Sequence, residues 1–170
     1  MGPAPNPLDA SWCHARVTGP AHRNVDLVLT HLRAGGAAPR ALDGMRVLPD
    51  AVTTAAAAAA ALGVEVGQIA NSLVFDADGE PLLVLTSGAH RVDTGKVAAL
   101  IGAGRVRRAS PDFVRAATGQ AIGGVAPVGH PAPLRTLVDR ALEQYAEVWA
   151  AGGIPQGVVQ VCHNTHHVRQ

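Results

Sequence analysis

The sequence predicts one α/β (α+β) domain in which helices flank a mixed, largely antiparallel sheet. Segment 72–88 places two apolar runs on either side of Asp78-Gly79, which is a strong signal for a β-hairpin. Other short apolar runs alternate with segments that carry helix caps and helix stops. The 170 residues suffice for one buried core, and no repeat or interior linker divides them.

The elements expected in the first half follow from local patterns. Residues 1–21 are rich in proline and alanine without periodicity, so we expect a loose amino-terminal extension. A helix is expected at 24–34, where apolar residues recur at helical spacing before a Gly-Gly stop. These residues are Val25, Val28, Leu29 and Leu32. A short strand at 45–49 precedes a helix at 53–63, whose run of alanines favours a helix that packs closely on a sheet.

The second half alternates between strands and helices more often. Both strands of the hairpin at 72–88 are nearly all apolar, so we expect them to be buried on both faces. Asp93 or Thr94 caps a helix that runs to about residue 102, and Ser110-Pro111 begins another that ends at Gly119. Further strands are expected at 105–109, 134–139, 147–151 and 157–161, with a short helical turn before 147–151.

The charge balance does not indicate a strongly basic, nucleic-acid-binding protein. The formal net charge is +1, which gives no global positive field. A local cluster contains Arg105, Arg107, Arg108 and Arg115. Its pattern favours a solvated face over a nucleic-acid patch.

Cysteine usage and hydropathy predict a cytoplasmic protein that does not enter a membrane. Cys13 and Cys162 lie near opposite ends and form no disulfide framework, which suits a reducing compartment. The amino terminus lacks the basic start and apolar run of a signal peptide. No stretch approaches the ~18 apolar residues that a membrane helix needs.

Segment 119–131, GQAIGGVAPVGHP, combines glycine with proline. Glycine permits positive φ and close approach of another group to the main chain, whereas proline fixes φ. The combination predicts a loop with a defined shape. Composition alone leaves two interpretations open: a long connector, or the backbone-lined wall of a pocket.

Several polar residues are candidates for a functional site, although no standard catalytic signature is present. His90 is either an acid–base group or a surface histidine. Asn71, just before a buried strand, either caps the strand entry or points into a cavity. Asp139 is a loop anchor unless its strand end opens onto a pocket. The tail CHNTHH (162–167) offers ligands for zinc, but their spacing fits no common zinc pattern.

Five segments resemble the YbaK/EbsC group of aminoacyl-tRNA deacylases, which are related to the editing domain of bacterial prolyl-tRNA synthetases. They are QIANSLVF (68–75), EPLLVLTSGAHRVD (80–93), ATGQAIGGVAPVGHP (117–131), LVDRAL (137–142) and EVWAAGG (147–153), in the family's order. The resemblance covers about residues 22–158. It implies a barrel-like mixed α/β fold and hydrolysis of tRNA that carries a wrong amino acid, often alanine or cysteine on tRNA for proline. It implies no metal cofactor.

The resemblance also implies the domain limits and the site. We expect an editing domain at 22–161 and an atypical tail at 162–170. Gly123-Gly-Val-Ala-Pro127 matches the family's Gly-x-x-x-Pro loop, which lines the pocket for the aminoacyl-adenosine end. The expected catalytic residues are Asn71, Gly123 and Gly124, with water as the nucleophile. The expected substrate-binding residues are Ser72, His90, Val125, Ala126, Pro127 and Asp139.

Two departures from the family keep other functions open. Asn71 stands where most characterised members carry lysine, and an amide cannot replace the charge of an ammonium. The tail at 162–170 does not continue as in other family members. A shift of the reading frame would produce such a difference, so we base no function on the tail. The expected partner is the acceptor end of an aminoacylated tRNA, and the sequence leaves open whether the chain forms a homodimer. The alternatives are a non-catalytic relative that binds aminoacyl-tRNA or a nucleotide, and a metal-binding protein that uses the tail.

Overall fold

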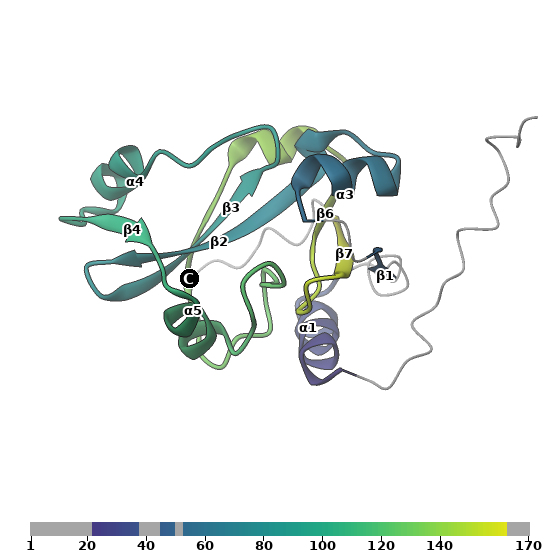
Figure 1. Cartoon of the computed structure of the whole chain (residues 1–170), viewed down its shortest axis with the longest axis horizontal. Coiled ribbons are helices and arrows are strands. Elements are labelled where there is room, and N and C mark those ends of the chain that lie inside the picture. Colours follow the sequence, from purple (N-terminus) through teal and green to yellow (C-terminus); the bar gives the residue numbers. More distant parts are fainter. Residues whose placement is uncertain (1–21, 38–44, 50–52, 163–170) are drawn as a thin grey trace, which may run out of the picture.

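A long β-hairpin forms the centre of the fold (Figure 1). Its strands β2 (Ile69–Ala77) and β3 (Glu80–Ser87) pair antiparallel along their length. Both central residues of the turn have positive φ, 53° at Asp78 and 94° at Gly79. This is the backbone of a type I′ turn, whose twist matches that of the strands. The predicted hairpin is confirmed, and its first strand begins at Ile69 rather than at residue 72.

The structure is a computed structural model that describes residues 22–37, 45–49 and 53–162. The predicted amino-terminal extension lies outside these residues. So do the histidines of the tail that were considered as zinc ligands. Within the described ranges, no helix is long and apolar enough to cross a membrane.

Seven strands form one open sheet in the order β1-β7-β6-β2-β3-β5, and β4 pairs with β2 beside this path. The remaining strands are β1 (Arg46–Val47), β4 (Val106–Arg108), β5 (Arg135–Val138), β6 (Glu147–Ala151) and β7 (Gly157–Cys162). The expectation of a barrel-like sheet is wrong, because the path ends in β1 and β5 at opposite edges and these two strands do not pair.

The sheet is mixed, as predicted, with more antiparallel than parallel pairings. Four pairings are antiparallel, whereas β2 pairs with β6 and β3 pairs with β5 in parallel. A parallel pair needs a long crossover connection. The chain between β3 and β5 contains two helices and the glycine-rich loop, so it provides one.

Two short strands share one edge of β2 and leave its middle unpaired. β6 pairs with Ile69 and Ala70 at the start of β2, and β4 pairs with Phe75 to Ala77 at its end. Neither strand reaches Asn71–Leu73. This gap in the pairing along one side of β2 sets the position of the cleft described below.

A different helix covers each face of the hairpin (Figure 1). α4 (Thr94–Ile101) packs on the face that carries Phe75, and α5 (Pro111–Thr118) packs on the face that carries Val74. Successive residues of a strand point to opposite faces. Burial of both faces was predicted, and the buried run Val74–Asp76 confirms it.

Two further helices cover the other end of the sheet. α1 (Arg23–Ala34) buries Val28 and Leu32 in a cluster with Val159 of β7. α3 (Ala55–Leu62) packs its alanines on Ile69 and Trp149. The small side chains of α3 therefore allow the close approach to the sheet that the sequence predicted.

The helix ends lie where the sequence placed them. Thr54 caps α3, Asp93 caps α4 and Ser110 caps α5, each by accepting a main-chain N–H bond. Glycines in the left-handed conformation end the same helices. A 3₁₀ turn, η3 (Arg140–Gln144), matches the predicted helical turn, whereas η2 (Val66–Gln68) was not predicted.

A buried carboxylate ties β2 to β4. Asp76 accepts hydrogen bonds of 2.8 Å from Arg107 Nε and 2.7 Å from the Gly79 N–H of the hairpin turn. Arg107 Nη2 also lies 2.7 Å from Asp76 Oδ2. The guanidinium and the turn N–H hold the pKa of Asp76 below its ordinary value.

We expect this pair to make stability depend on acid pH. Because the pKa of Asp76 is depressed in the folded state, its stabilisation is present above the pKa of the unfolded chain, near 3.8, and is lost as pH falls through the folded pKa. The free energy of unfolding should therefore fall in acid, and Asp76→Asn should flatten that decline. Urea titrations of both proteins at neutral and acid pH measure it. Equal acid slopes for the variant and the wild type would show that the pair does not act in this way.

Candidate active site

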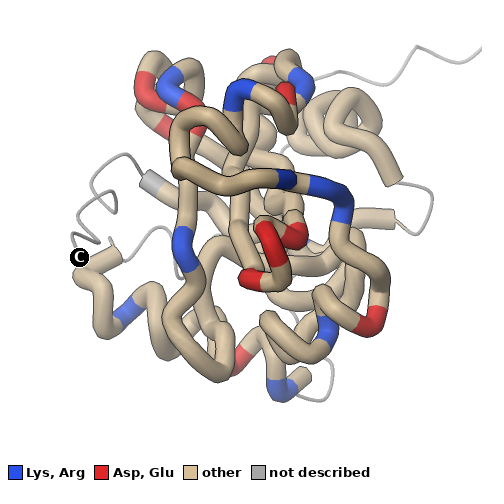
Figure 2. Tube along the Cα trace, turned by 90° about the vertical axis from the view of Figure 1, so that its left-hand side faces the viewer, with Lys and Arg blue, Asp and Glu red and all other residues tan. Residues whose placement is uncertain are grey.

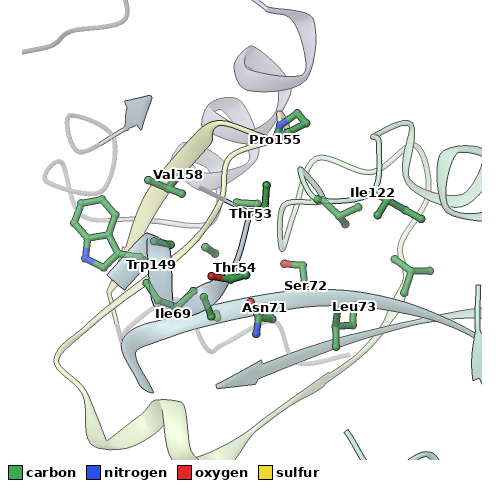
Figure 3. Close-up of a pocket in the computed structure, with 18 of the residues that line it drawn as sticks. Thr53, Thr54, Ile69, Asn71, Ser72, Leu73, Ile122, Trp149, Pro155 and Val158 are labelled. Atoms are coloured by element: carbon green, nitrogen blue, oxygen red, sulfur yellow. The ribbon is translucent and has the colours of Figure 1, made fainter. Parts of the chain in front are cut away.

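A cleft of about 340 Å³ opens at the break in the edge of β2 (Figure 3). The middle of β2 lines it, together with parts of β4, β6, β7, α3 and the loop 119–131. Most of the lining is alanine and aliphatic side chains. The polar exceptions are Thr53, Thr54, Asn71, Ser72 and Arg108. A mostly apolar cleft of this size with a few polar groups is typical of a small-molecule site.

Ser72 presents a buried hydroxyl on the loop side of β2. Figure 3 shows this hydroxyl on the same side of the strand as Thr54 and Ile122. Its Oγ atom is buried and has no hydrogen-bond partner among the described residues. A buried polar group without a partner costs about 1–3 kcal/mol. The hydroxyl therefore keeps an unused hydrogen-bonding capacity beside the cleft.

Asn71 lines the cleft from the strand, but its side chain lies on the other face of the sheet. Figure 3 shows its amide nitrogen on the opposite side of β2 from the Ser72 hydroxyl. The strand register agrees with this placement, because Asn71 of β2 pairs with Thr86 of β3 and cross-strand partners share a face. Thr86 donates a hydrogen bond to Asp139 on that face.

The loop 119–131 is held in shape by one buried amide. Gln120 is only 2% exposed. Its Oε1 accepts the Ala126 N–H at 2.7 Å, and its Nε2 lies 3.4 Å from the carbonyl oxygens of Val128 and Gly129. Gln120 thus connects both limbs of the loop and gives it a defined shape.

Two further contacts fix the loop, one with another segment and one within the loop. Gly124 packs against the chain at Ile154, where a Cβ atom would lie 2.5 Å from the main-chain carbon of that residue. His130 Nε2 lies 2.9 Å from the Ala126 carbonyl, so this ring nitrogen donates a proton to it. Burial lowers the pKa of His130 and favours the neutral ring.

These bonds leave the N–H groups of alternate loop residues available. The N–H groups of Gly124 and Ala126 are bonded inside the loop, to Ala121 O and Gln120 Oε1. No hydrogen bond within the described part of the chain uses the N–H of Gly123 or Val125. Both of these residues line the cleft. The loop therefore brings to the cleft two residues whose N–H groups no other described residue uses.

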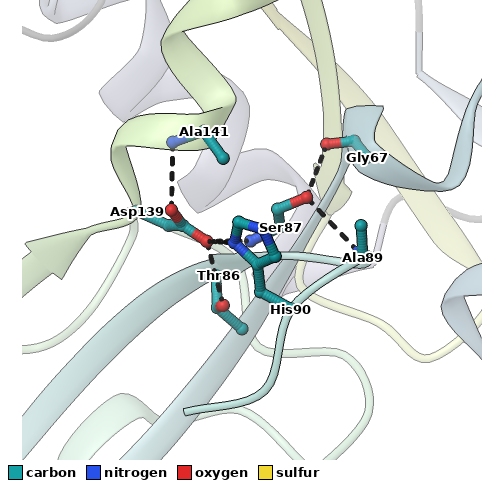
Figure 4. Close-up of polar contacts among 7 residues, drawn as sticks. All are labelled: Gly67, Thr86, Ser87, Ala89, His90, Asp139 and Ala141. Carbon is teal, nitrogen blue, oxygen red and sulfur yellow. Dashed lines mark hydrogen bonds and ion pairs between the residues drawn. The ribbon is translucent and has the colours of Figure 1, made fainter. Parts of the chain in front are cut away.

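His90 and Asp139 form a separate polar network (Figure 4). His90 Nδ1 lies 2.7 Å from Asp139 Oδ2, which also accepts bonds from Thr86 Oγ1 and the Ser87 N–H. Burial alone would raise the pKa of Asp139, but hydrogen bonds from His90 and two main-chain N–H groups outweigh it and lower the pKa. Asp139 also caps η3 through the Ala141 N–H. Its position is that of an anchor between β3, β5 and η3.

The structure divides the predicted site residues into two groups. The cleft is lined by Asn71, Ser72, Gly123 and Val125. The residues outside its lining are Gly124, Ala126, Pro127, His90 and Asp139. Within the described residues, no cluster of three His, Cys, Asp or Glu side chains could hold a metal ion.

Among the cleft residues that sequence reasoning missed, four are notable. They are Thr53, Thr54, Arg108 and Ile122. Thr53 and Thr54 were considered only as part of the helix expected at 53–63, and Arg108 only as part of a solvated cluster. Ile122 is 54% exposed although it is large and apolar, and its place inside the glycine-rich loop was the one available signal.

The chain matches a known protein family over more than half of its length. Residues 49–164 match the aminoacyl-tRNA editing domain. The chain belongs to this family. The match includes β2, with its unpaired middle, and the loop 119–131, and it confirms the resemblance that the sequence motifs indicated.

Relatives of this editing domain include proline–tRNA ligases. That of Nitratidesulfovibrio vulgaris is 36% identical over 91 residues, which are 54% of this chain and 16% of the ligase. The uncharacterized protein YwhH of Bacillus subtilis is 30% identical over 105 residues, 61% of this chain and 66% of YwhH. The chain therefore spans a small part of the ligases and about two thirds of YwhH.

A solved structure shares the fold over most of the editing domain. It is described as a candidate trans-editing enzyme for prolyl-tRNA synthetase. It superposes with a TM-score of 0.74 at 41% identity, over 84% of this chain and 88% of that chain. This similarity supports the mixed α/β architecture as a property of the family.

Proposed function

We propose that the chain hydrolyses the ester bond of a mischarged aminoacyl-tRNA, and that the cleft beside the middle of β2 is the site of the reaction. The observation that carries the proposal is the set of unused hydrogen-bond donors in this cleft. The Ser72 hydroxyl and the N–H groups of Gly123 and Val125 have no partner among the described residues. Donors of this kind stabilise the negative charge that develops on an ester carbonyl.

The cleft performs the chemistry by position rather than by an acid–base side chain. Within the described lining there is no histidine, cysteine, lysine, aspartate or glutamate. Water attacks the carbonyl carbon, the ester C–O bond breaks, and the ribose 3′-oxygen leaves with a proton. The vicinal 2′-hydroxyl of the terminal ribose orients the water and relays the proton. The protein supplies orientation, exclusion of solvent and donors to the oxyanion.

The lining is apolar and suits a small, uncharged amino acid. Alanines form part of it, at Ala55, Ala58, Ala70 and Ala150. A small-residue pocket discriminates by size, and one methylene changes such discrimination by about 1–3 kcal/mol. Because the relatives include proline–tRNA ligases, alanine or cysteine on tRNA for proline is the proposed substrate. The chain would act in trans, on tRNA released from the synthetase.

One observation keeps a second function in view. Asn71 stands at the position where most characterised members carry lysine. The amide of Asn71 lies on the face of β2 opposite the Ser72 hydroxyl. A chain without that charge could bind aminoacyl-tRNA or a nucleotide without hydrolysing it. In this second function the unused donors hold the ligand but do not accelerate its reaction.

A deacylation panel distinguishes the two functions. Purified protein is incubated with tRNA for proline charged with alanine, cysteine or proline, and with correctly charged tRNA for alanine as a control. We expect loss of the mischarged amino acid above the spontaneous rate, and no acceleration for proline. Binding of these tRNAs without acceleration for any of them would favour the binding protein.

A further inference from the structure

A glutamine and a histidine hold the same residue of the loop 119–131 from its two ends. Gln120 Oε1 accepts the Ala126 N–H at 2.7 Å, and His130 Nε2 lies 2.9 Å from the Ala126 carbonyl oxygen. Ala126 is fully buried. Because both polar groups of its main chain are bonded within the loop, the peptide groups on either side of it have fixed orientations. Val125 shares the first of these peptide groups and lines the cleft.

Gln120 is itself anchored to the end of α5. Thr118 Oγ1 accepts the Gln120 N–H at 3.0 Å, and the same hydroxyl lies 2.7 Å from the carbonyl oxygen of Val114 one turn earlier. Val114 packs in one buried cluster with Val74 of β2, two residues after Ser72. The position of Gln120 relative to Ser72 is therefore set by a helix and a strand that pack against each other.

Hydrogen bonds between neutral groups hold this part of the protein. The sequence from 116 to 134 contains no Asp, Glu, Lys or Arg. The two ion pairs among the described residues involve other segments. Figure 2 shows Lys and Arg interspersed with Asp and Glu on the side of the molecule that it draws, without a broad field of one sign. A neutral substitution at Gln120 should therefore have the same effect at low and at high salt.

We propose that Gln120 is a positioning residue, which holds Gly123 and Val125 of the loop at the distance from Ser72 that ester hydrolysis requires. The inference rests on the proposed function for the reaction. Gln120 is 2% exposed and lies outside the lining of the cleft, so it acts through the main chain of the loop. Positioning of this kind lowers the barrier of the reaction more than it strengthens binding of the substrate.

The kinetic test compares methionine variants of two buried glutamines, because methionine is similar in size but cannot form the bonds of the amide. Gln120→Met should lower kcat for mischarged tRNA about tenfold or more and leave KM within about threefold. Gln160→Met is the matched control, because Gln160 is also buried, at 8% exposure, and lies outside the loop and the cleft lining. Its kcat should stay within about threefold of the wild type. Circular dichroism identifies a temperature at which all the proteins are folded.

Gln120→Glu tests the same bonds with a smaller change. A neutral glutamic acid can accept from the Ala126 N–H and donate to the carbonyl oxygen of Val128 or Gly129, whereas the carboxylate can only accept. Burial raises the pKa of a carboxyl group at this position. We expect the kcat of Gln120→Glu, divided by that of the wild type at the same pH, to rise about fivefold or more from about pH 8 to about pH 5.5. A ratio that stays equally low over this range would contradict the inference.

Amide hydrogen exchange of the free protein separates this inference from the proposed function. The Ala126 N–H should exchange about tenfold or more faster in Gln120→Met than in the wild type, and Gln160→Met should not change it. Faster exchange, with a wild type that deacylates no tRNA, would refute the hydrolase but support the hold of Gln120 on the loop. Unchanged exchange at Ala126, a loss that appears in KM alone, a normal kcat for Gln120→Met, or an equal loss in Gln160→Met would overturn the inference. If Gln120→Met does not fold, the ratio for Gln120→Glu decides.

Discussion

Ser72→Ala is expected to lower kcat/KM for deacylation about tenfold or more and to leave the free energy of unfolding unchanged or higher. The variant lacks a hydrogen-bond donor to the reacting carbonyl, so the transition state is less stabilised. A tenfold loss of kcat/KM corresponds to about 1.4 kcal/mol of transition-state stabilisation. The stability follows from the folded state, where the hydroxyl is buried without a partner among the described residues. Removing an unsatisfied buried group costs nothing in the free protein and can stabilise it. Single-turnover deacylation and urea unfolding measure the two quantities.

Two variants control this experiment. Ser72→Thr keeps the hydroxyl and should retain activity within about threefold. Asn71→Ala changes the adjacent side chain, which points to the opposite face, and should also stay within about threefold. If Asn71→Ala loses about tenfold while Ser72→Ala does not, the catalytic role predicted for Asn71 from the sequence is correct and the role of Ser72 is not.

Gly123→Val should reduce turnover about a hundredfold while the protein remains folded. A Cβ atom at Gly123 would meet nothing within 4 Å, so the free protein has room for the side chain. Because Gly123 lines the cleft, that side chain would occupy the space the ester needs. Its φ of +87° adds strain of about 1–2 kcal/mol for a residue with a side chain. Circular dichroism and thermal unfolding check the fold, and deacylation kinetics check the rate.

Gly124→Ala provides the contrasting control. Its Cβ would meet the main chain at Ile154 and Pro155 at 2.5 and 2.6 Å, so the loop or that segment must move. We expect a loss of stability of about 1–3 kcal/mol, with any loss of activity accompanied by it. If Gly123→Val deacylates at a near-normal rate, the loop is a connector and does not approach the substrate.

Local signals were sufficient to predict most of the elements. Asp78-Gly79 favours positive φ at two successive residues, so these two residues alone predict the position of the hairpin turn. The cap residues Thr54, Asp93 and Ser110 each accept the main-chain N–H of the residue three positions later, so helix starts of this kind can also be predicted from the sequence. Such features depend on neighbours in the sequence, which is why the predictions agree with the structure.

Non-local pairing could not be predicted in the same way. Nothing within residues 69–77 shows that β4 and β6 divide one edge of β2 and leave Asn71–Leu73 unpaired. Strand alternation predicts that Asn71 and Ser72 point to opposite faces, but it does not tell which face meets the loop. That depends on where the crossover through α5 returns.

The candidate site shows the same division. The glycine-rich loop was found from its composition, whereas the role of Gln120 depends on bonds to residues six to nine positions away along a folded loop. His90 and Asp139 were chosen as polar residues near strand ends. The structure brings them together at 2.7 Å, but outside the lining of the cleft. Their part in substrate binding stays a prediction.

The position of a bound substrate analogue would show where the ester is hydrolysed. A crystal structure with 3′-alanylamino-3′-deoxyadenosine, in which an amide replaces the labile ester, would show where the acyl group lies. We expect its carbonyl oxygen to lie about 3 Å from Ser72 Oγ or from the N–H groups of Gly123 and Val125, in the cleft between β4 and β6. An analogue bound on the opposite face, beside Asn71 and the His90–Asp139 network, would show that this cleft is not the site of the reaction.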